Sequence, residues 1–204
     1  MPTSSLSNTL EMQRPPRETV SPIEPGRAES RRAALPGLTI AVLAVLFGFL
    51  MGGVFGLNED LIKGRLSASA AAVTATVYKG DAAAAEPVVA KSWDYMQRAH
   101  LHGGAMGTAA IGMILLMLLI GTKPRMLRIL GIALGAGALG YAIFWMWAGF
   151  LAPGMGSTGA AKESLRWLAM PSSGAMMLAT AAVAFLSLKA WVQGGRLSTQ
   201  FRGD

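Results

Sequence analysis

Only two histidines occur in the chain, and they stand close together at the start of a long apolar run. His100 and His102 lie within the segment Arg98-Ala-His-Leu-His-Gly-Gly. An α-helix turns about 100° per residue, so the two imidazoles point in different directions, whereas His102 and Met106 share one stripe of the helix. Imidazole and thioether groups are ligands of haem iron and of Cu(I). We therefore take His100, His102 and Met106 as candidate cofactor- or metal-binding residues.

The same pattern has simpler interpretations. Histidines at the edge of a membrane find backbone or carboxylate hydrogen-bond partners for purely structural reasons. Methionine is a common filler of apolar packing, and the chain holds 13 of them. A role in quinone binding or proton relay is a further alternative. The sequence leaves these alternatives open, and because His100 lies nearer the water, we expect His102 to contribute more to stability.

Aromatic and carboxylate residues are expected at the same depth as the histidines. The short connection around Lys123 makes an antiparallel hairpin, and equal counts along its two arms bring Trp145 and Trp147 level with the histidines. These rings form either an ordinary interfacial belt or a stacking wall for a planar cofactor. Carboxylates in the loops on this side are placed to orient a histidine by hydrogen bonding. The supporting residues that we predict are Asp94, Arg98, Trp145, Trp147 and Glu163.

The elements that position these residues are predicted to be membrane-spanning helices. The chain of 204 residues is 52% hydrophobic and only 14% charged, whereas charged residues make up about a quarter of a soluble domain. A helix needs about 20 apolar residues to span the hydrocarbon core. We therefore expect an all-α polytopic membrane protein with four transmembrane helices in an up-down topology, at residues 35–57, 99–120, 126–150 and 168–190.

The segments outside these helices are assigned by their composition. The N-terminal segment combines Ser, Pro, Arg and Glu with few large apolar side chains, which is typical of disorder. The two longer connections are expected to build a small helical extramembrane cap over the bundle. The resulting divisions are a disordered basic cytoplasmic tail at 1–34, a membrane domain at 35–191 with outer loops at 58–98 and 151–167, and a cytoplasmic tail at 192–204.

Local signals place helix ends within the two outer loops. Asn58 is suited to the N-terminal cap of a short helix, and Glu59 in its first turn is favoured by the helix dipole. Gly80 is expected to break that helix. In the second loop, Ser157 or Thr158 is a suitable cap for another short helix.

The net charge of +7 is explained by membrane topology rather than by nucleic-acid binding. If both tails and the hairpin around Lys123 are cytoplasmic, 11 of the 18 basic residues lie on that side, and the outer loops are nearly neutral. This distribution follows the positive-inside rule. It predicts a multi-pass protein of the bacterial inner membrane with both termini in the cytoplasm and the lipid bilayer as its surroundings.

Glycines recur at spacings that favour close helix packing. Gly48, Gly52 and Gly56 form one stripe of the first predicted helix, and Gly131 and Gly135 thin the third. Because these positions carry no side chain, another backbone can approach closely. The pattern predicts tight packing and says nothing specific about chemistry.

Two resemblances add to this interpretation. Trp93, the segment Arg98-Ala-His-Leu-His102 and the segment Leu151 to Glu163 resemble a group of small four-helix bacterial inner-membrane proteins of unassigned function. That resemblance implies a four-helix fold over residues 35–191 and no activity. The start of the histidine helix is also similar to the haem-ligating helix of subunit I of haem-copper oxidases. The chain lacks the second haem-ligating histidine and the copper-site histidines of that subunit, so it is not the catalytic subunit.

No complete catalytic set is visible. The chain has no cysteine, no phosphate-binding P-loop, no Gly-x-Ser-x-Gly elbow and no charged residue deep in an apolar run, which argues against a hydrolase or an ion pump. We expect a non-catalytic subunit or assembly factor of a bacterial respiratory or redox membrane complex, with other membrane subunits as partners. The alternative is a membrane protein that binds haem b or copper through His102 and Met106. A small-molecule channel or carrier is a third class.

Overall fold

The structure is a computed structural model that describes residues 25–200. Every regular element in this range is a helix, and four helices are long and apolar enough to cross a membrane. The predicted fold class, all-α with four candidate spans, is therefore confirmed. The elements in chain order are α2 (Pro25–Ala71), η1 (Ala83–Ala85), α3 (Glu86–Leu119), α4 (Pro124–Met155), α5 (Thr158–Ser164) and α6 (Arg166–Gln200).

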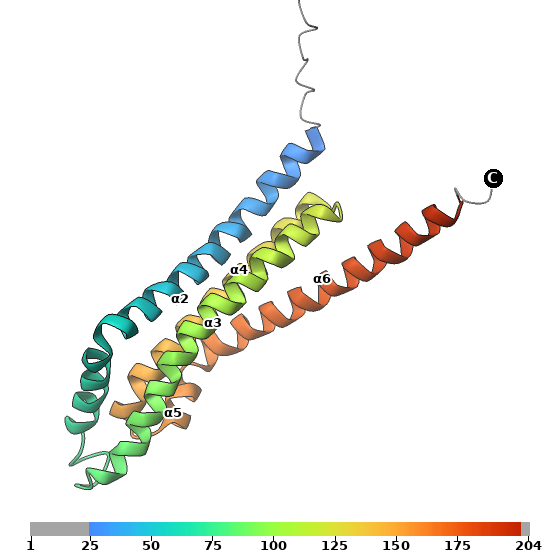
Figure 1. The fold of residues 1–204 in the computed structure, drawn as a ribbon. Coiled ribbons are helices and arrows are strands. Elements are labelled where there is room, and N and C mark those ends of the chain that lie inside the picture. The colour runs from blue at the N-terminus through green and yellow to red at the C-terminus, as the bar shows by residue number, and fades with distance from the viewer. Residues whose placement is uncertain (1–24, 201–204) are drawn as a thin grey trace, which may run out of the picture.

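Helices α2, α3 and α4 pack against one another in pairs, whereas α6 packs mainly against α4 (Figure 1). The main core lies between these helices and includes Ile114, Met117, Leu127 and Leu134, all fully buried. Apolar side chains on the outer faces of the same helices are exposed, as expected for a surface that lipid covers. The bundle is thus a three-helix unit with a fourth helix on one side.

Glycines bring the backbones of the three-helix unit together. A Cβ atom at Gly48 of α2 would lie 2.5 Å from the backbone nitrogen of Gly104 in α3, and Gly37 of α2 lies against the backbone of Gly131 in α4. The predicted close approach is confirmed at Gly48, but a Cβ at Gly56 would meet nothing within 4 Å. The stripe predicted on α2 therefore supports packing over only part of its length.

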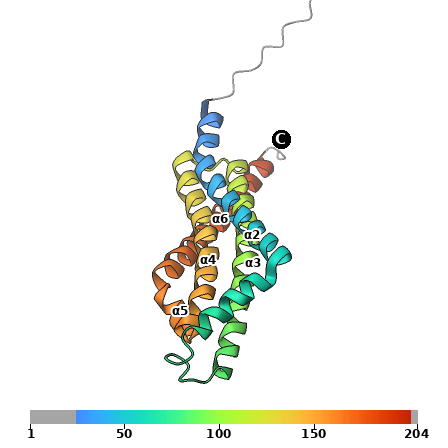
Figure 2. The ribbon, with the colours of Figure 1, turned by 90° about the vertical axis from the view of Figure 1, so that its left-hand side faces the viewer.

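The two ends of the bundle differ in structure. The start of α2, the turn between α3 and α4, and the end of α6 lie at one end, which we call the hairpin end (Figure 1). The other end, which we call the cap end, carries η1, α5 and the last part of α2. Asn58, with φ −150° and ψ 50°, interrupts α2 at a kink, and Figure 2 shows α2 changing direction along its length. The predicted helix start at Asn58 is thus a kink within one element.

Several helix ends differ from those predicted. The segment 25–34, expected to be disordered, is the first part of α2. Ala33 and Ala34 are buried in the main core, and this packing outweighs a composition that is poor in large apolar residues. Residues 1–24 and 201–204 of the two predicted tails lie outside the described residues. The described part of the C-terminal tail, residues 192–200, continues α6.

The first outer loop is more helical than predicted near the membrane and less helical in its middle. The helix after Asn58 ends at Ala71 rather than at Gly80, and α3 begins at Glu86, well before the predicted span at 99–120. Lys79 and Gly80 both adopt positive φ, 55° and 83°. Ala-rich turns without large side chains have little apolar surface to bury, which explains the early end of the helix.

A single buried tyrosine fastens this loop to the bundle. The Tyr78 hydroxyl donates a 2.8 Å hydrogen bond to the carbonyl oxygen of Pro153 near the end of α4. Burial raises the pKa of the Tyr78 phenol above its usual value. Ser157 caps α5, as predicted, by accepting a 3.2 Å hydrogen bond from the amide of Ala160.

Candidate functional site

His100 faces α2 and fills the space that two glycines leave. Its Nδ1 lies 2.7 Å from the carbonyl oxygen of Gly48. A carbonyl only accepts hydrogen bonds, so Nδ1 carries the proton in this contact. The ring lies against Gly52, where a Cβ would approach the imidazole Cε1 to 2.6 Å, and 6.0 Å from the ring of Phe55. His100 is therefore part of the α2–α3 packing.

His102 faces the opposite partner, α4. Its Nδ1 lies 2.7 Å from the carbonyl oxygen of Arg98, one turn earlier in the same helix, and donates to it. The imidazole packs at 5.2 Å from Tyr141 and 6.1 Å from Trp145, measured between ring centroids. The two histidines thus diverge, as the helical spacing predicted, and no contact joins them to a common partner.

The arrangement leaves one ligand position on each imidazole. With Nδ1 donating to a backbone carbonyl, the neutral ring keeps its lone pair on Nε2, which is the tautomer that many metal-ligating histidines use. Met106 is half-buried one turn after His102 and packs against the main core. Within residues 26–193, no group of three or more His, Asp or Glu side chains could hold a metal ion. A metal or haem ligand set would therefore rest on His102 and Met106.

The rings beside His102 belong to a group that we call the aromatic cluster, composed of the buried Tyr95, Phe144 and Trp145 and the partly buried Tyr141. Trp145 lies 4.8 Å from Tyr95 and 5.1 Å from Phe144 between centroids, with tilted or edge-on geometry. Such contacts are favourable for aromatic pairs. The cluster joins α3 to α4 directly next to His102.

Arg98 covers the aromatic cluster with its positive charge. The guanidinium carbon lies 4.9 Å from the centroid of Trp145 and 5.6 Å from that of Tyr95. Lys162 of α5 adds a second cation, 5.8 Å from the Tyr95 ring. Cations over aromatic faces are stabilised by the ring quadrupole. The predicted residues Arg98 and Trp145 are thus in contact with each other and, through Trp145, with His102.

Trp145 has an unmet hydrogen-bonding requirement. Its indole Nε1 is buried and has no hydrogen-bond partner among the described residues. A buried donor without an acceptor costs about 1 to 3 kcal/mol. The position next to His102 therefore offers a donor to a water molecule or to a bound acceptor group.

Trp147 lies outside this cluster although it is close in sequence. It is 44% exposed and packs at 6.4 Å from Trp167, which is itself exposed. This pair has the composition and exposure of an interfacial belt, one of the two interpretations that the sequence left open. Counting residues from Lys123 along both arms of the hairpin predicted the correct end of the bundle for Trp145 and Trp147. It could not predict the direction in which each ring points.

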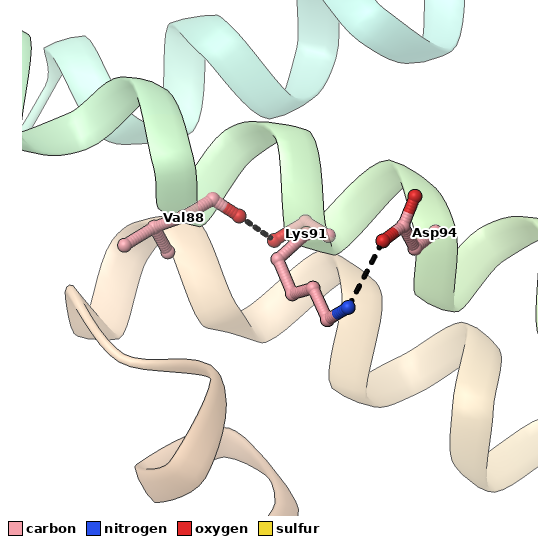
Figure 3. Close-up of polar contacts among 4 residues, drawn as sticks. Val88, Lys91 and Asp94 are labelled. Carbon is pink, nitrogen blue, oxygen red and sulfur yellow. Dashed lines mark hydrogen bonds and ion pairs between the residues drawn. The ribbon is translucent and has the colours of Figure 1, made fainter.

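The two predicted carboxylates pair with neighbours three residues away in the sequence and not with a histidine. Asp94 accepts a 3.1 Å hydrogen bond from Lys91 on α3 (Figure 3). Glu163 accepts one of 3.2 Å from Arg166. All four side chains are about half exposed or more. Backbone carbonyls, and not the predicted Asp94 and Glu163, therefore orient both imidazoles.

Asp94 instead lines a hollow at the cap end. This hollow has a volume of about 610 Å³ and lies between the last part of α2, the following turn, and the start of α3. Its walls are mostly Ala, Val and Leu, with Lys63 and Glu86 among the polar residues. The Lys63 ammonium lies 5.2 Å from the ring of Trp93. Sequence reasoning missed this hollow because the turn that closes it has no distinctive motif.

Sequence reasoning also missed Tyr95, the residue that joins Arg98, Lys162 and Trp145. Its place beside His102 could have been predicted in part, because Tyr95, Ala99 and His102 recur at helical spacing and share a face of α3. The carbonyl of Gly48, by contrast, is separated from His100 by about fifty positions, and no local signal connects them.

Compared with known proteins, the chain matches no family model, no curated protein and no solved structure at a significant level.

Proposed function

We propose that this protein is a non-catalytic integral membrane subunit or assembly factor of a bacterial respiratory or redox membrane complex. It resides in the inner membrane with the hairpin end in the cytoplasm. The observation that carries the proposal is a face of α3 made of small residues that no other described helix covers. Such a face is suited to a helix of another subunit.

The small-residue face lies in the middle of the apolar part of α3. Ala105, Thr108, Ala109 and Gly112 are exposed along it, and a Cβ at Gly104 or Gly112 would meet nothing within 4 Å. At Gly37, Gly48 and Gly135, by contrast, the backbone of a neighbouring helix lies against the glycine. Helix association in a membrane depends on such close packing, because lipid tails remove most of the hydrophobic driving force.

Co-purification of single variants tests this proposal. Gly112→Leu adds a large side chain to the small-residue face, and it should abolish recovery of partner subunits from the native membrane in mild detergent. Gly53→Leu is the matched control, because a Cβ at Gly53 of α2 also meets nothing within 4 Å. Both variants should keep the wild-type melting temperature. A wild-type protein that purifies as a stable monomer with no partner would contradict the proposal.

A specific observation favours the alternative, binding of haem b or copper by His102 and Met106. The Nδ1 of His102 is already held by the Arg98 carbonyl, which leaves Nε2 as the ligand atom, and the aromatic cluster and the unpaired Trp145 Nε1 lie beside it. An optical spectrum and metal analysis of the purified protein decide the matter. A Soret band or stoichiometric copper that is lost in His102→Ala would support this function; their absence from the wild type would eliminate it.

The proposed orientation rests on the distribution of charge between the two ends. Lys123, Arg125 and Arg128 follow one another at the hairpin end, whereas the cap end carries acidic and basic residues in similar numbers. Single cysteines at Ser5 and Ala75, in a chain that has none of its own, should react oppositely with an impermeant thiol reagent in intact cells. Only Ala75→Cys is expected to be labelled from outside. Equal labelling of the two would refute the orientation.

A further inference from the structure

A groove opens at the hairpin end where α6 diverges from α4 (Figure 1). It has a volume of about 510 Å³. Its walls are apolar, and two basic residues stand at one end. The walls are formed by Met126, Ile129 and Leu130 of α4 with Ala182, Phe185 and Leu186 of α6, and the basic residues are Lys123 and Arg125.

The positive charge of Lys123 and Arg125, at the end of the groove that we call its mouth, is not neutralised within the described residues. Lys123 and Arg125 are both exposed, and the three ion pairs of the described chain, all involving other residues, lie toward the cap end. Glu29 is the only carboxylate of the described residues at the hairpin end, and it lies on α2, which does not line the groove. The mouth therefore attracts an anion.

The start of α4 adds to this attraction. Lys123 occupies the cap position of α4; Pro124 after it has no amide hydrogen, and no side chain accepts a hydrogen bond from the amides of Arg125 and Met126. Amide groups in the first turn of a helix and the positive end of the helix dipole both favour a phosphate. Two side-chain cations and a helix start thus converge on the same end of one groove.

The depth of the groove indicates what kind of anion it receives. From Lys123 to Leu130 the wall extends about 10 Å along α4, which carries it from the headgroup region into the hydrocarbon core. A free phosphate would use the cations but not the apolar walls. A phospholipid uses both, with its phosphate at the boundary and an acyl chain against the helices.

We propose that the groove between α4 and α6 is a binding site for an anionic phospholipid. The headgroup phosphate contacts Lys123 and Arg125, and one acyl chain lies between Ile129 of α4 and Phe185 of α6. The lipid fills the space between α6 and the three-helix unit and fixes the position of α6. This site is independent of the small-residue face of α3 and of the histidines.

Native mass spectrometry of the full-length protein with equal amounts of phosphatidylglycerol and phosphatidylcholine tests the proposal. Phosphatidylglycerol should be retained preferentially. Lys123→Gln with Arg125→Gln should lower its retention about 25-fold, or fivefold per basic residue, the ratio that about 1 kcal/mol each corresponds to. Arg65→Gln with Lys79→Gln removes the same charge from the cap end and should leave retention unchanged. Equal retention of both lipids by the wild type would overturn the proposal.

A second variant separates a lipid in the groove from an anion on the surface. Ala182→Phe fills the groove while both cations remain, and it should also reduce retention of phosphatidylglycerol. Unchanged retention in this variant, or displacement of the lipid by inorganic phosphate, would show that the charges bind without the groove and would overturn the proposal. If Ala182→Phe fails to fold, Ile129→Trp replaces it: acyl-brominated phosphatidylglycerol should quench the added tryptophan more than brominated phosphatidylcholine does, and equal quenching would count against the site.

Discussion

The membrane part of the three-helix unit and the cap end are held together by different means. Between α2, α3 and α4, glycines let backbone meet backbone, as at Gly48 and Gly104, with no side chain between them. At the cap end, single side chains make the connections, as Tyr78 does to the carbonyl of Pro153. The difference follows from the surroundings: in lipid, close packing is the main attraction available, whereas near water individual hydrogen bonds can fasten a loop.

The two histidines differ in the same way: one takes part in packing between backbones, and the other makes side-chain contacts. His100 lies in the glycine-lined contact between α2 and α3 and bonds to a carbonyl of another helix. His102 bonds within its own helix and faces the aromatic cluster, where Arg98 and Trp145 meet. His100 therefore belongs to the packing of the bundle, and His102 is the histidine that lies beside the aromatic cluster and the unpaired Nε1 of Trp145.

The largest effect is expected where a side chain is placed between two backbones. In Gly48→Ala the new Cβ would lie 2.5 Å from the amide nitrogen of Gly104 and 3.0 Å from the carbonyl oxygen of His100, and neither backbone atom can move alone. We expect a loss of about 1 to 3 kcal/mol, the range typical of overpacking, measured as a lower melting temperature in detergent. Gly53→Ala, where a Cβ meets nothing within 4 Å, should not lower stability and, because Ala is the better helix former, should raise it by up to about 1 kcal/mol. Equal melting temperatures would contradict the close contact.

The next largest loss of stability is expected at one of the two histidines, and alanine variants compare them directly. His100→Ala removes a hydrogen bond that joins α3 to α2 and leaves a space against Gly52, so we expect a loss of about 1 to 3 kcal/mol. His102→Ala breaks a bond within α3 only, and the loss should be smaller. This order reverses the one expected from depth in the membrane. A lower melting temperature for His102→Ala than for His100→Ala would restore the original order.

The number and location of the spans could be predicted from the sequence, because long apolar runs have few alternatives to membrane helices. The cap at Ser157 was also readable, and so was the position of a break at Asn58, although it proved to be a kink within α2 rather than the start of a separate helix. The directions of the histidines depend instead on Gly48 and Tyr141, which are far away in sequence. A pattern along one helix cannot reveal which neighbouring helix each of its faces meets.

The prediction that Asp94 and Glu163 orient a histidine failed for a different reason. Lys91 precedes Asp94 by three residues on α3, the spacing at which oppositely charged side chains meet on a helix. Arg166 follows Glu163 by three residues, across the short turn from α5 to α6. Those local pairs were therefore predictable and were overlooked in favour of a more distant role beside the histidines. Although exposed pairs of this kind contribute little to stability, they are enough to turn a flexible side chain away from a distant partner.

At the cap end we expect a smaller effect, from the loss of one hydrogen bond. Tyr78→Phe keeps the ring in its cluster with Ala70 and Ala85 and removes only the bond to the Pro153 carbonyl. The expected loss is about 1 kcal/mol at neutral pH. Amide hydrogen exchange in the turn at residues 72–82 should accelerate more than exchange in α3 around His100. An equal change in both regions would mean that the cap and the three-helix unit do not open separately.

The smallest expected effect is a pH dependence of stability that arises from Tyr78 at the cap end. Because burial raises the pKa of Tyr78, the folded protein holds the neutral phenol at pH values where the unfolded chain, with an ordinary tyrosine pKa near 10, has begun to ionise. The contribution of Tyr78 is therefore complete below about pH 10 and is lost as the pH rises through the folded-state pKa. The melting temperatures of the wild type and Tyr78→Phe should converge above pH 10, while lysines that titrate in the same range affect both proteins equally. A difference that stays constant from pH 7 to pH 11 would show that the phenol is not protected by the loop it fastens.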